Sequence, residues 1–252
     1  MTDPLFDLTG KVAVVTGGSR GLGRVMVEAF AARGADVVVA SRKIEPCEQA
    51  VAEIAQRHGR RGLAVACNVS HWEQCDALVD AAYDAFGHVD VLVNNAGLSP
   101  LYPSLDQVTE ALWDKVIGVN LKGPFRLASL VGTRMAAGAG GSIINVSSIA
   151  AIRPTPAELP YAAAKAGLNT LTEGLARAFG PSVRVNAIQA GPFLTDISHA
   201  WDLDAFTARA KETIALGRGG EPDEVVGAAL YFASAASSYC TGAVLRLDGG
   251  VR

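Results

Sequence analysis

The sequence predicts an α/β fold in which helices cover both faces of a parallel sheet. This is the doubly wound arrangement, with a layer of helices, a sheet and a second layer of helices (αβα). Short runs of β-branched residues alternate along the chain with longer segments of helical periodicity, which is typical of successive βαβ units. Several of the short runs are apolar throughout, as expected of strands buried on both faces. A glycine-rich turn follows the first run and precedes a helical segment, where doubly wound sheets bind ligands.

About seven strands are predicted. They are Val12–Thr16, Ala35–Ala40, Leu63–Cys67, Val89–Asn94, Ser142–Ser147, Val183–Ile188 and Ala243–Leu247. The helical segments include Gly21–Arg33, His71–Phe86, Leu121–Met135, Leu159–Phe179 and Pro222–Ala233. The longest irregular segment runs from about 190 to 218, and its length suggests a lid or substrate loop. Because no repeat or linker interrupts the pattern, residues 1–252 are expected to form a single domain.

Composition excludes several classes of protein. Half of the 252 residues are hydrophobic and 19% are charged, so a disordered chain is excluded. The net charge of -3 gives no electrostatic reason to expect nucleic acid or an anionic membrane as a partner. The first residues contain no apolar run of signal-peptide length, and a cytoplasmic protein is expected. The cysteines, Cys47, Cys67, Cys75 and Cys240, form no metal-binding pattern and are expected to be reduced.

The turn after the first strand runs from Thr16 through Gly17, Gly18, Ser19, Arg20, Gly21 and Leu22 to Gly23. Glycines here let the backbone approach a pyrophosphate, which then lies at the N-terminus of the next helix. The spacing is G-x-x-x-G-x-G, which differs from the general dinucleotide fingerprint G-x-G-x-x-G. A glycine-rich segment can also be no more than a turn, but its position directly after the first strand favours a phosphate site.

The residues after the second strand bear on the choice of cofactor. Folds that bind NAD place an acid there to hold the ribose 2′-hydroxyl, whereas this chain has Ser41 and Arg42. Asp36 lies at the other end of the strand, and Glu45 lies beyond the loop. An arginine can pair with a 2′-phosphate, and Arg20 in the glycine turn adds a second charge. A lone arginine is more often a solvated side chain, but two at these places predict NADP(H), with NAD(H) as the alternative.

Three side chains form a candidate catalytic group. Ser148 follows the fifth strand, and Tyr161 and Lys165 lie four residues apart at the start of a helix, on one helical face. A nearby ammonium is expected to lower the pKa of Tyr161 from about 10, so that it serves as general acid or base. Ser148 can hydrogen-bond the carbonyl oxygen, and Lys165 can also hold the nicotinamide ribose. The alternative is an ordinary start of an amphipathic helix.

In this order and spacing the motifs resemble the short-chain dehydrogenase/reductase family over essentially the whole chain. They are T-G-x-x-x-G-x-G from Thr16, N-N-A-G from Asn94, a helix asparagine at Asn120, Ser148, Y-x-x-x-K at Tyr161 and Lys165, Gly191-Pro192 with Thr195, and Asp248-Gly249-Gly250. The resemblance implies a Rossmann-type sheet in one dinucleotide-binding catalytic domain. It also implies an oxidoreductase that moves a hydride between a nicotinamide cofactor and a carbonyl or alcohol.

The resemblance implies roles for individual residues. Asn120 would complete a catalytic tetrad with Ser148, Tyr161 and Lys165 by holding a water that relays protons to Lys165. Cofactor contacts would come from Gly17, Ser19, Arg20, Gly21, Leu22, Gly23, Ser41, Arg42, Asn68, Val69, Asn94, Ala96, Gly97, Tyr161, Lys165, Gly191 and Thr195. Asn94 to Gly97 would pack against the adenosine side, while Ile188, Gly191 and Thr195 would line the nicotinamide. Asn68 replaces a frequent aspartate, and Ala190 replaces a frequent proline whose loss would loosen the loop.

The substrate is less defined. Pocket candidates by position are mostly apolar: Leu98, Ala150, Ile152, Phe193, Leu194 and Trp201. Ordinary loop packing is the alternative for each. The related 3-oxoacyl-carrier-protein reductases usually carry basic residues before the fifth and sixth strands, where residues 135–141 and 179–182 have no charge. Arg134 and Arg153 are isolated, so a small free substrate is favoured over a carrier-bound one.

Other functions account for fewer of the motifs. A non-catalytic NADP(H) sensor would not need the whole tetrad, and a methyltransferase would not need the Ser-Tyr-Lys spacing. A sugar-nucleotide epimerase normally has a larger C-terminal domain. The family resemblance further implies a homotetramer or dimer. The small residues of Leu121–Met135 and Leu159–Phe179 would permit close packing between subunits, and the last strand would be an exposed edge.

Overall fold

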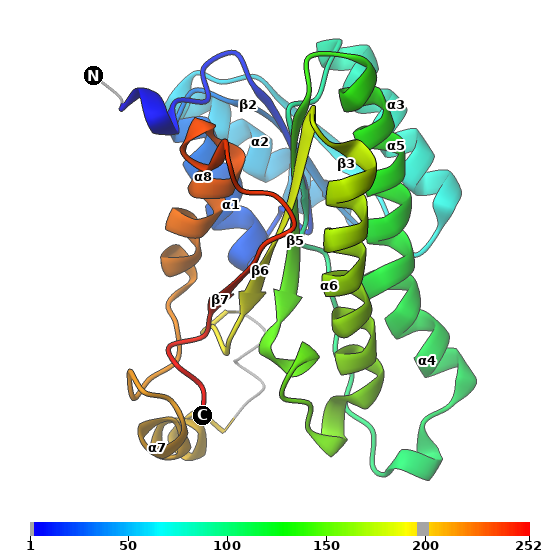
Figure 1. The fold of residues 1–252 in the computed structure, drawn as a ribbon, viewed down its shortest axis with the longest axis vertical. Coiled ribbons are helices and arrows are strands. Elements are labelled where there is room, and N and C mark those ends of the chain that lie inside the picture. The colour runs from blue at the N-terminus through cyan, green and yellow to red at the C-terminus, as the bar shows by residue number, and fades with distance from the viewer. Residues whose placement is uncertain (1–2, 196–201) are drawn as a thin grey trace.

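The computed structural model describes residues 3–195 and 202–252. Its centre is a parallel seven-stranded sheet in the order β3-β2-β1-β4-β5-β6-β7 (Figure 1). The strands are β1 (Val12–Thr16), β2 (Asp36–Ser41), β3 (Gly62–Ala66), β4 (Val91–Asn94), β5 (Gly141–Ser148), β6 (Val183–Ala190) and β7 (Val244–Leu247). Each strand begins and ends within two residues of its predicted bounds, so the predicted fold class is confirmed.

Six of the helices described form a layer on each face of the sheet: α1 (Gly21–Ala32), α2 (Ile44–His58) and α8 (Val226–Ala233) on one face, and α3 (Trp72–Phe86), α5 (Gly123–Ala137) and α6 (Leu159–Phe179) on the other. The structure also contains α4 (Glu110–Ile117) and α7 (Leu203–Thr213), and α7 packs in a cluster of its own. One apolar core joins α1, α2 and α8 to the sheet, and a second joins α3, α5 and α6 to the opposite face (Figure 1). None of the helices within the described ranges is long and apolar enough to cross a membrane.

Two of the predicted helical segments begin with a turn that is not α-helical. The segment expected at Leu121–Met135 begins in a π-helical turn, Gly118–Lys122, which leads directly into α5. The segment expected at Pro222–Ala233 begins as a 3-10 turn, Pro222–Val225, before α8. The π-helical turn matters for function because such turns are frequent at functional sites, and this one contains Asn120.

The segment from 190 to 218 is not irregular throughout, because it contains α7. Asp202 caps this helix by accepting a hydrogen bond from the amide of Ala205 at 3.0 Å. Phe206, Ala210 and Ile214 are spaced four residues apart and form one buried apolar stripe. The sequence contains this four-residue spacing, but the charged residues around it make the helical pattern weak.

The topology places the candidate site at one edge of the sheet. The carboxyl ends of the parallel strands point to the same edge, as the arrowheads of β5 and β6 show in Figure 1. The strand order reverses between β1 and β4, where the chain's glycine turn leaves β1. Such a switch point opens a crevice for a ligand. At the other side, β7 is the edge strand that the sequence predicted.

Candidate active site

The glycine turn has no room for side chains at the positions that matter. Gly17 and Gly21 have positive φ angles of 65° and 52°. A Cβ atom on Gly23 would lie 2.2 Å from the carbonyl oxygen of Gly17. The backbone at the start of α1 is therefore open to a pyrophosphate, as a dinucleotide requires.

Asn95, which the sequence analysis did not select individually, holds this turn in place. Its Nδ2 donates to the carbonyl oxygens of Thr16 at 2.9 Å and Gly17 at 3.2 Å. Thr16 Oγ1 accepts hydrogen bonds from the amides of Asn95 at 3.0 Å and Ala96 at 3.1 Å. The ends of β1 and β4 are thus joined. The N-N-A-G motif was the available signal, but only the structure distinguishes its two asparagines.

The Asn94 side chain forms a buried hydrogen-bond network. Its Nδ2 donates to Asn145 Oδ1 at 2.9 Å, and Asn145 Nδ2 donates to Thr172 Oγ1 at 2.9 Å. All three residues are buried. This network ties β4 to β5 and α6, so the Asn94 side chain lies in the core and leaves the outer surface to Asn95, Ala96 and Gly97.

The region expected to receive a 2′-phosphate joins two separate segments. Ser19 Oγ of the glycine turn lies 2.8 Å from Ser41 Oγ at the end of β2. Arg20 and Arg42 adjoin these serines and are exposed, and neither guanidinium has an ion-pair partner within residues 3–195 and 202–252. Two available cations beside a glycine-rich turn fit a phosphorylated dinucleotide.

Asp36 is committed elsewhere. It lies at the start of β2, where Arg60 and Arg61 each form an ion pair with its carboxylate at 2.8 Å. Burial opposes ionisation, but these arginines outweigh it and hold the pKa of Asp36 below its ordinary value. The prediction that Asp36 stands at the wrong end of β2 for a ribose is confirmed.

The residues after β3 form a capped turn. Asn68 Oδ1 accepts hydrogen bonds from the amide of Ser70 at 3.2 Å and its hydroxyl at 2.9 Å. Val69 is buried in the core, and its carbonyl accepts from the Cys75 thiol at 3.3 Å. Asn68 therefore caps this turn and remains partly exposed.

Ser148, Tyr161 and Lys165 meet at the junction of β5 and α6. Ser148 ends β5, Tyr161 lies in the first turn of α6, and Lys165 lies one turn further. The Lys165 Nζ lies 5.6 Å from the centroid of the Tyr161 ring and donates to the carbonyl of Val146 at 2.7 Å. Ser148 Oγ also accepts from the amide of Ala150 at 3.2 Å. The sequence predicted this grouping, and the structure brings the three residues together.

Asn120 links this group to the loop after β4. Its buried Nδ2 donates to the carbonyls of Leu98 at 2.8 Å and Val116 at 3.0 Å, and its Oδ1 accepts from the Leu98 amide at 3.3 Å. A Cβ atom on Gly97 would lie 3.0 Å from Asn120 Oδ1 and 3.8 Å from Lys165 Nζ. Asn120 and Lys165 therefore approach one another across a gap that only a glycine leaves open.

Burial governs both titratable groups of the site. Burial raises the pKa of Tyr161 to about 12, the hydrogen bond with Ser148 opposes this change, and the Glu158 carboxylate adds to it. Burial also lowers the pKa of Lys165 to about 8. The expectation of a lowered pKa for Tyr161 is therefore wrong for this structure, because loss of solvation raises that pKa.

The loop after β6 reaches the glycine turn. The Gly191 amide donates to the carbonyl of Leu247 at 2.9 Å, and a Cβ there would lie 2.5 Å from the Cα of Asp248. Thr195 lies close to the turn, since a Cβ built on Gly21 would stand 3.7 Å from its Cβ. Ala190 remains paired in β6 with its neighbours in β5 and β7.

Most pocket candidates are packing residues. Ala150 and Phe193 are buried, as is Ile188, and Leu98 and Leu194 are partly buried against apolar clusters. Ile152 is 50% exposed, and Trp201 lies outside the described residues. Arg134 pairs with Asp80 and stacks on Tyr83, and Arg153 is exposed. Arg134 is therefore engaged on the α3 side of the molecule.

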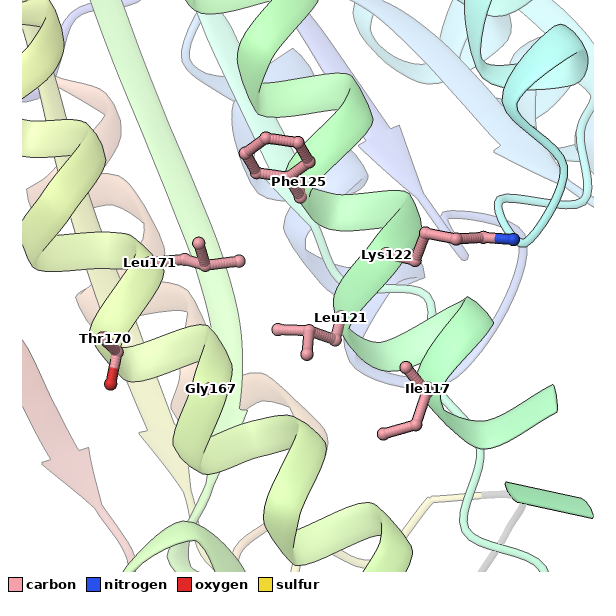
Figure 2. A pocket seen from close by; sticks show the side chains of 7 residues that line it. All are labelled: Ile117, Leu121, Lys122, Phe125, Gly167, Thr170 and Leu171. Atoms are coloured by element: carbon pink, nitrogen blue, oxygen red, sulfur yellow. The ribbon is translucent and has the colours of Figure 1, made fainter. Parts of the chain in front are cut away.

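A separate groove of about 400 Å³ lies between α6 and the segment from α4 to α5 (Figure 2). It is lined by Ile117, Leu121, Lys122, Phe125, Gly167, Thr170 and Leu171. None of these residues belongs to the catalytic group. Figure 2 shows Leu121 and Leu171 projecting into the space between the two helical segments, and Lys122 is the only charged lining residue.

Comparison with known proteins agrees with this geometry. The family model described as enoyl-(acyl carrier protein) reductase matches residues 17–252. Dehydrogenase/reductase SDR family member 4 from Homo sapiens is 37% identical over 96% of this chain and 88% of its own length. D-threitol dehydrogenase from Mycolicibacterium smegmatis is 37% identical over 97% of this chain and 94% of its own length. The crystal structure of NADPH-dependent 3-quinuclidinone reductase from Rhodotorula rubra superposes with a TM-score of 0.92, at 32% identity over 98% of this chain and 93% of that chain.

Proposed function

Because the chain belongs to the short-chain dehydrogenase/reductase family of oxidoreductases, we propose that it is an NADP(H)-dependent enzyme. Members of this family act on alcohol and carbonyl groups with a nicotinamide cofactor. The proposed reaction interconverts a ketone or aldehyde and its alcohol. The observation that carries this proposal is the meeting of Ser148, Tyr161 and Lys165 at the sheet edge that also holds the glycine turn. This arrangement supports a proton donor at Tyr161 close to the proposed site of the hydride carrier.

Each side chain has a separate task in the proposed reaction. The Ser148 hydroxyl donates to the carbonyl oxygen of the substrate, where negative charge develops. Tyr161 gives its proton to that oxygen in reduction and takes it back in oxidation. Lys165, in its protonated form, stabilises the phenolate of Tyr161, and Asn120 holds the neighbouring loop against this group. The nicotinamide, when bound, supplies or accepts the hydride.

The preference for NADP(H) over NAD(H) is part of the proposal. Its support is the pair of exposed arginines, Arg20 and Arg42, whose loops are joined by the contact between Ser19 and Ser41. The named NADPH dependence of the quinuclidinone reductase is consistent with this choice. NAD(H) is the alternative cofactor.

Two alternative functions use the same fold. A non-catalytic NADP(H) sensor would leave the assembled Ser148, Tyr161 and Lys165 without a task. A carrier-bound substrate, as in a 3-oxoacyl-carrier-protein reductase, would suit the description of the matched family model. Arg134 is engaged with Asp80, which favours a small free substrate.

Oxidation of NADPH, followed by absorbance with a panel of ketones and aldehydes, tests the proposal. We expect turnover with at least one substrate class and a loss of about a hundredfold or more in Tyr161→Phe, because that variant lacks the proton donor. Tight binding of NADPH by the variant is the control for folding. Full turnover in Tyr161→Phe would require another proton donor, and silence of the wild type despite tight NADPH binding would favour the sensor.

We also propose that a second copy of this chain packs on the groove between α5 and α6, giving a dimer or, with a second contact, a tetramer. The groove is mostly apolar, Phe125 at its rim is 40% exposed, and Gly167 has no side chain to fill it. These features suit the packing of a like surface.

A cytosolic location is proposed as well, and the four free thiols support it.

A further inference from the structure

A single hydroxyl joins the loop after β4 to the segment that leads from β5 into α6. Tyr102 lies in the loop after β4, and its Oη donates to the carbonyl of Pro156 at 2.6 Å. The same oxygen accepts a hydrogen bond from the amide of Leu159 at 2.9 Å. Both partners belong to the segment that leads from β5 into α6. Tyr102 therefore bridges residues more than fifty positions apart in the sequence.

This bridge takes the place of an ordinary helix cap. The first amides of a helix have no partner within the helix, and a side chain at the N-cap commonly accepts from one of them. At α6 the N-cap is Glu158, which makes no such bond, and its carboxylate accepts from the Thr155 hydroxyl at 3.1 Å. Pro160 has no amide hydrogen. The cap of Leu159, the first residue of α6, comes from the neighbouring loop.

The capped turn carries the proposed proton donor. Tyr161 follows Leu159 by two residues, so the first turn of α6 sets where its ring stands relative to Ser148. The bridged loops also carry apolar side chains at the sheet edge, since Leu101 is 85% exposed and Ile152 is 50% exposed. Loss of the bridge would leave the amide of Leu159, in the turn that carries Tyr161, without this partner.

We propose that Tyr102 is a positioning residue for the carbonyl–alcohol reaction. Its hydroxyl caps α6 from the adjacent loop and thereby holds Tyr161 at the distance and angle that proton transfer to the substrate requires. The inference rests on the proposed function, because it assigns Tyr102 to the step in which Tyr161 gives up its proton. Small displacements of a reacting group lower rates steeply, so an external cap can control turnover.

Tyr102→Phe tests this role because it keeps the ring and removes both hydrogen bonds. We expect kcat to fall by about tenfold or more, while KM for the carbonyl substrate and Kd for NADPH change by less than about twofold. The Leu159 amide should exchange its hydrogen faster in the variant. Tyr239→Phe, which removes the hydroxyl of a fully exposed tyrosine, is the matched control and should alter none of these quantities.

A second variant separates positioning from general destabilisation. In the Tyr102→Phe background, Glu158→Ser places a hydroxyl at the N-cap and should restore part of kcat, compared with Glu158→Ser alone. An unchanged kcat in Tyr102→Phe, or a loss explained by weaker NADPH binding or a smaller folded fraction, would overturn the inference. If the wild type reduces none of the carbonyl compounds, the proposed function is contradicted instead. In that case, an unchanged rate of hydrogen exchange at the Leu159 amide in Tyr102→Phe would reject the cap independently.

Discussion

At the scale of single residues, burial decides the chemistry of the site more than the identity of neighbouring charges. Tyr161 and Lys165 are one helical turn apart, yet burial raises the pKa of the first to about 12 and lowers that of the second to about 8. Each group is thereby pushed toward its neutral form. Oxidation needs Tyr161 as phenolate and Lys165 as ammonium. This arrangement has the same number of protons as the neutral phenol beside the neutral amine, which is the more abundant of the two.

This balance predicts a specific pH dependence. The first proton leaves the pair near pH 8, so kcat/KM for alcohol oxidation should rise about tenfold per pH unit below that value and level off above it. In Lys165→Met, the residual rate should continue to rise above pH 8, because Tyr161 then titrates alone. Initial rates between pH 6 and 10 measure both profiles. A wild-type profile that rises without levelling off would contradict the coupling.

A second residue-scale prediction concerns Arg42. Arg42→Asp should weaken NADPH relative to NADH by about 10- to 100-fold, since it replaces a charge-assisted hydrogen bond with repulsion of the 2′-phosphate. Fluorescence titration with both cofactors measures the ratio. Arg177→Asp, an exposed site near the other end of α6, is the control and should leave the ratio unchanged. Equal losses for both cofactors in Arg42→Asp would reject the assignment.

At the scale of elements, the strand-to-helix turn after β1 depends on close contact between backbones. The carboxyl ends of β1, β4 and β5 lie at one edge of the sheet, and a Cβ atom added at Gly17 or Gly23 would lie within 3.0 Å of the Asn95 side chain. Gly23 is the tightest point, since a Cβ there would lie 2.2 Å from a carbonyl oxygen of the same turn.

Gly23→Ala should therefore disturb the turn itself. We expect a loss of about 1–3 kcal/mol in the free energy of unfolding, together with at least a tenfold weaker binding of NADPH. Gly227→Ala is the matched control, because nothing lies within 4 Å of a Cβ at that helical position. The control should raise stability by up to about 1 kcal/mol. Urea unfolding and NADPH titration measure the two effects, and normal binding by Gly23→Ala would contradict the role of the turn.

At the scale of the whole molecule, the apolar groove between α5 and α6 predicts self-association. Phe125→Glu should shift the protein toward monomer in sedimentation velocity at micromolar concentration, because a buried unpaired charge would oppose the contact. Leu5→Glu, at another exposed apolar residue, should leave the distribution unchanged. A wild type that sediments only as a monomer would refute the proposed assembly.

The sequence by itself determined the elements and the residue types of the site. Alternating periodicity and the continuous apolar runs specified the strands, and the spacing of the glycines, Ser148, Tyr161 and Lys165 specified the candidate chemistry. These features are local or depend on fixed spacing, so they are visible without packing. Even α7 left a local signal in the spacing of Phe206, Ala210 and Ile214.

Only the tertiary structure decided what depends on contacts between distant segments. It assigned Asn94 to the core and Asn95 to the glycine turn, and it showed that Tyr102 caps a helix that begins more than fifty residues later. It also reversed the expected pKa shift of Tyr161. The physical reason is that solvation and long-range hydrogen bonding are set by how completely elements pack together, and a spacing along the chain carries no information about that burial.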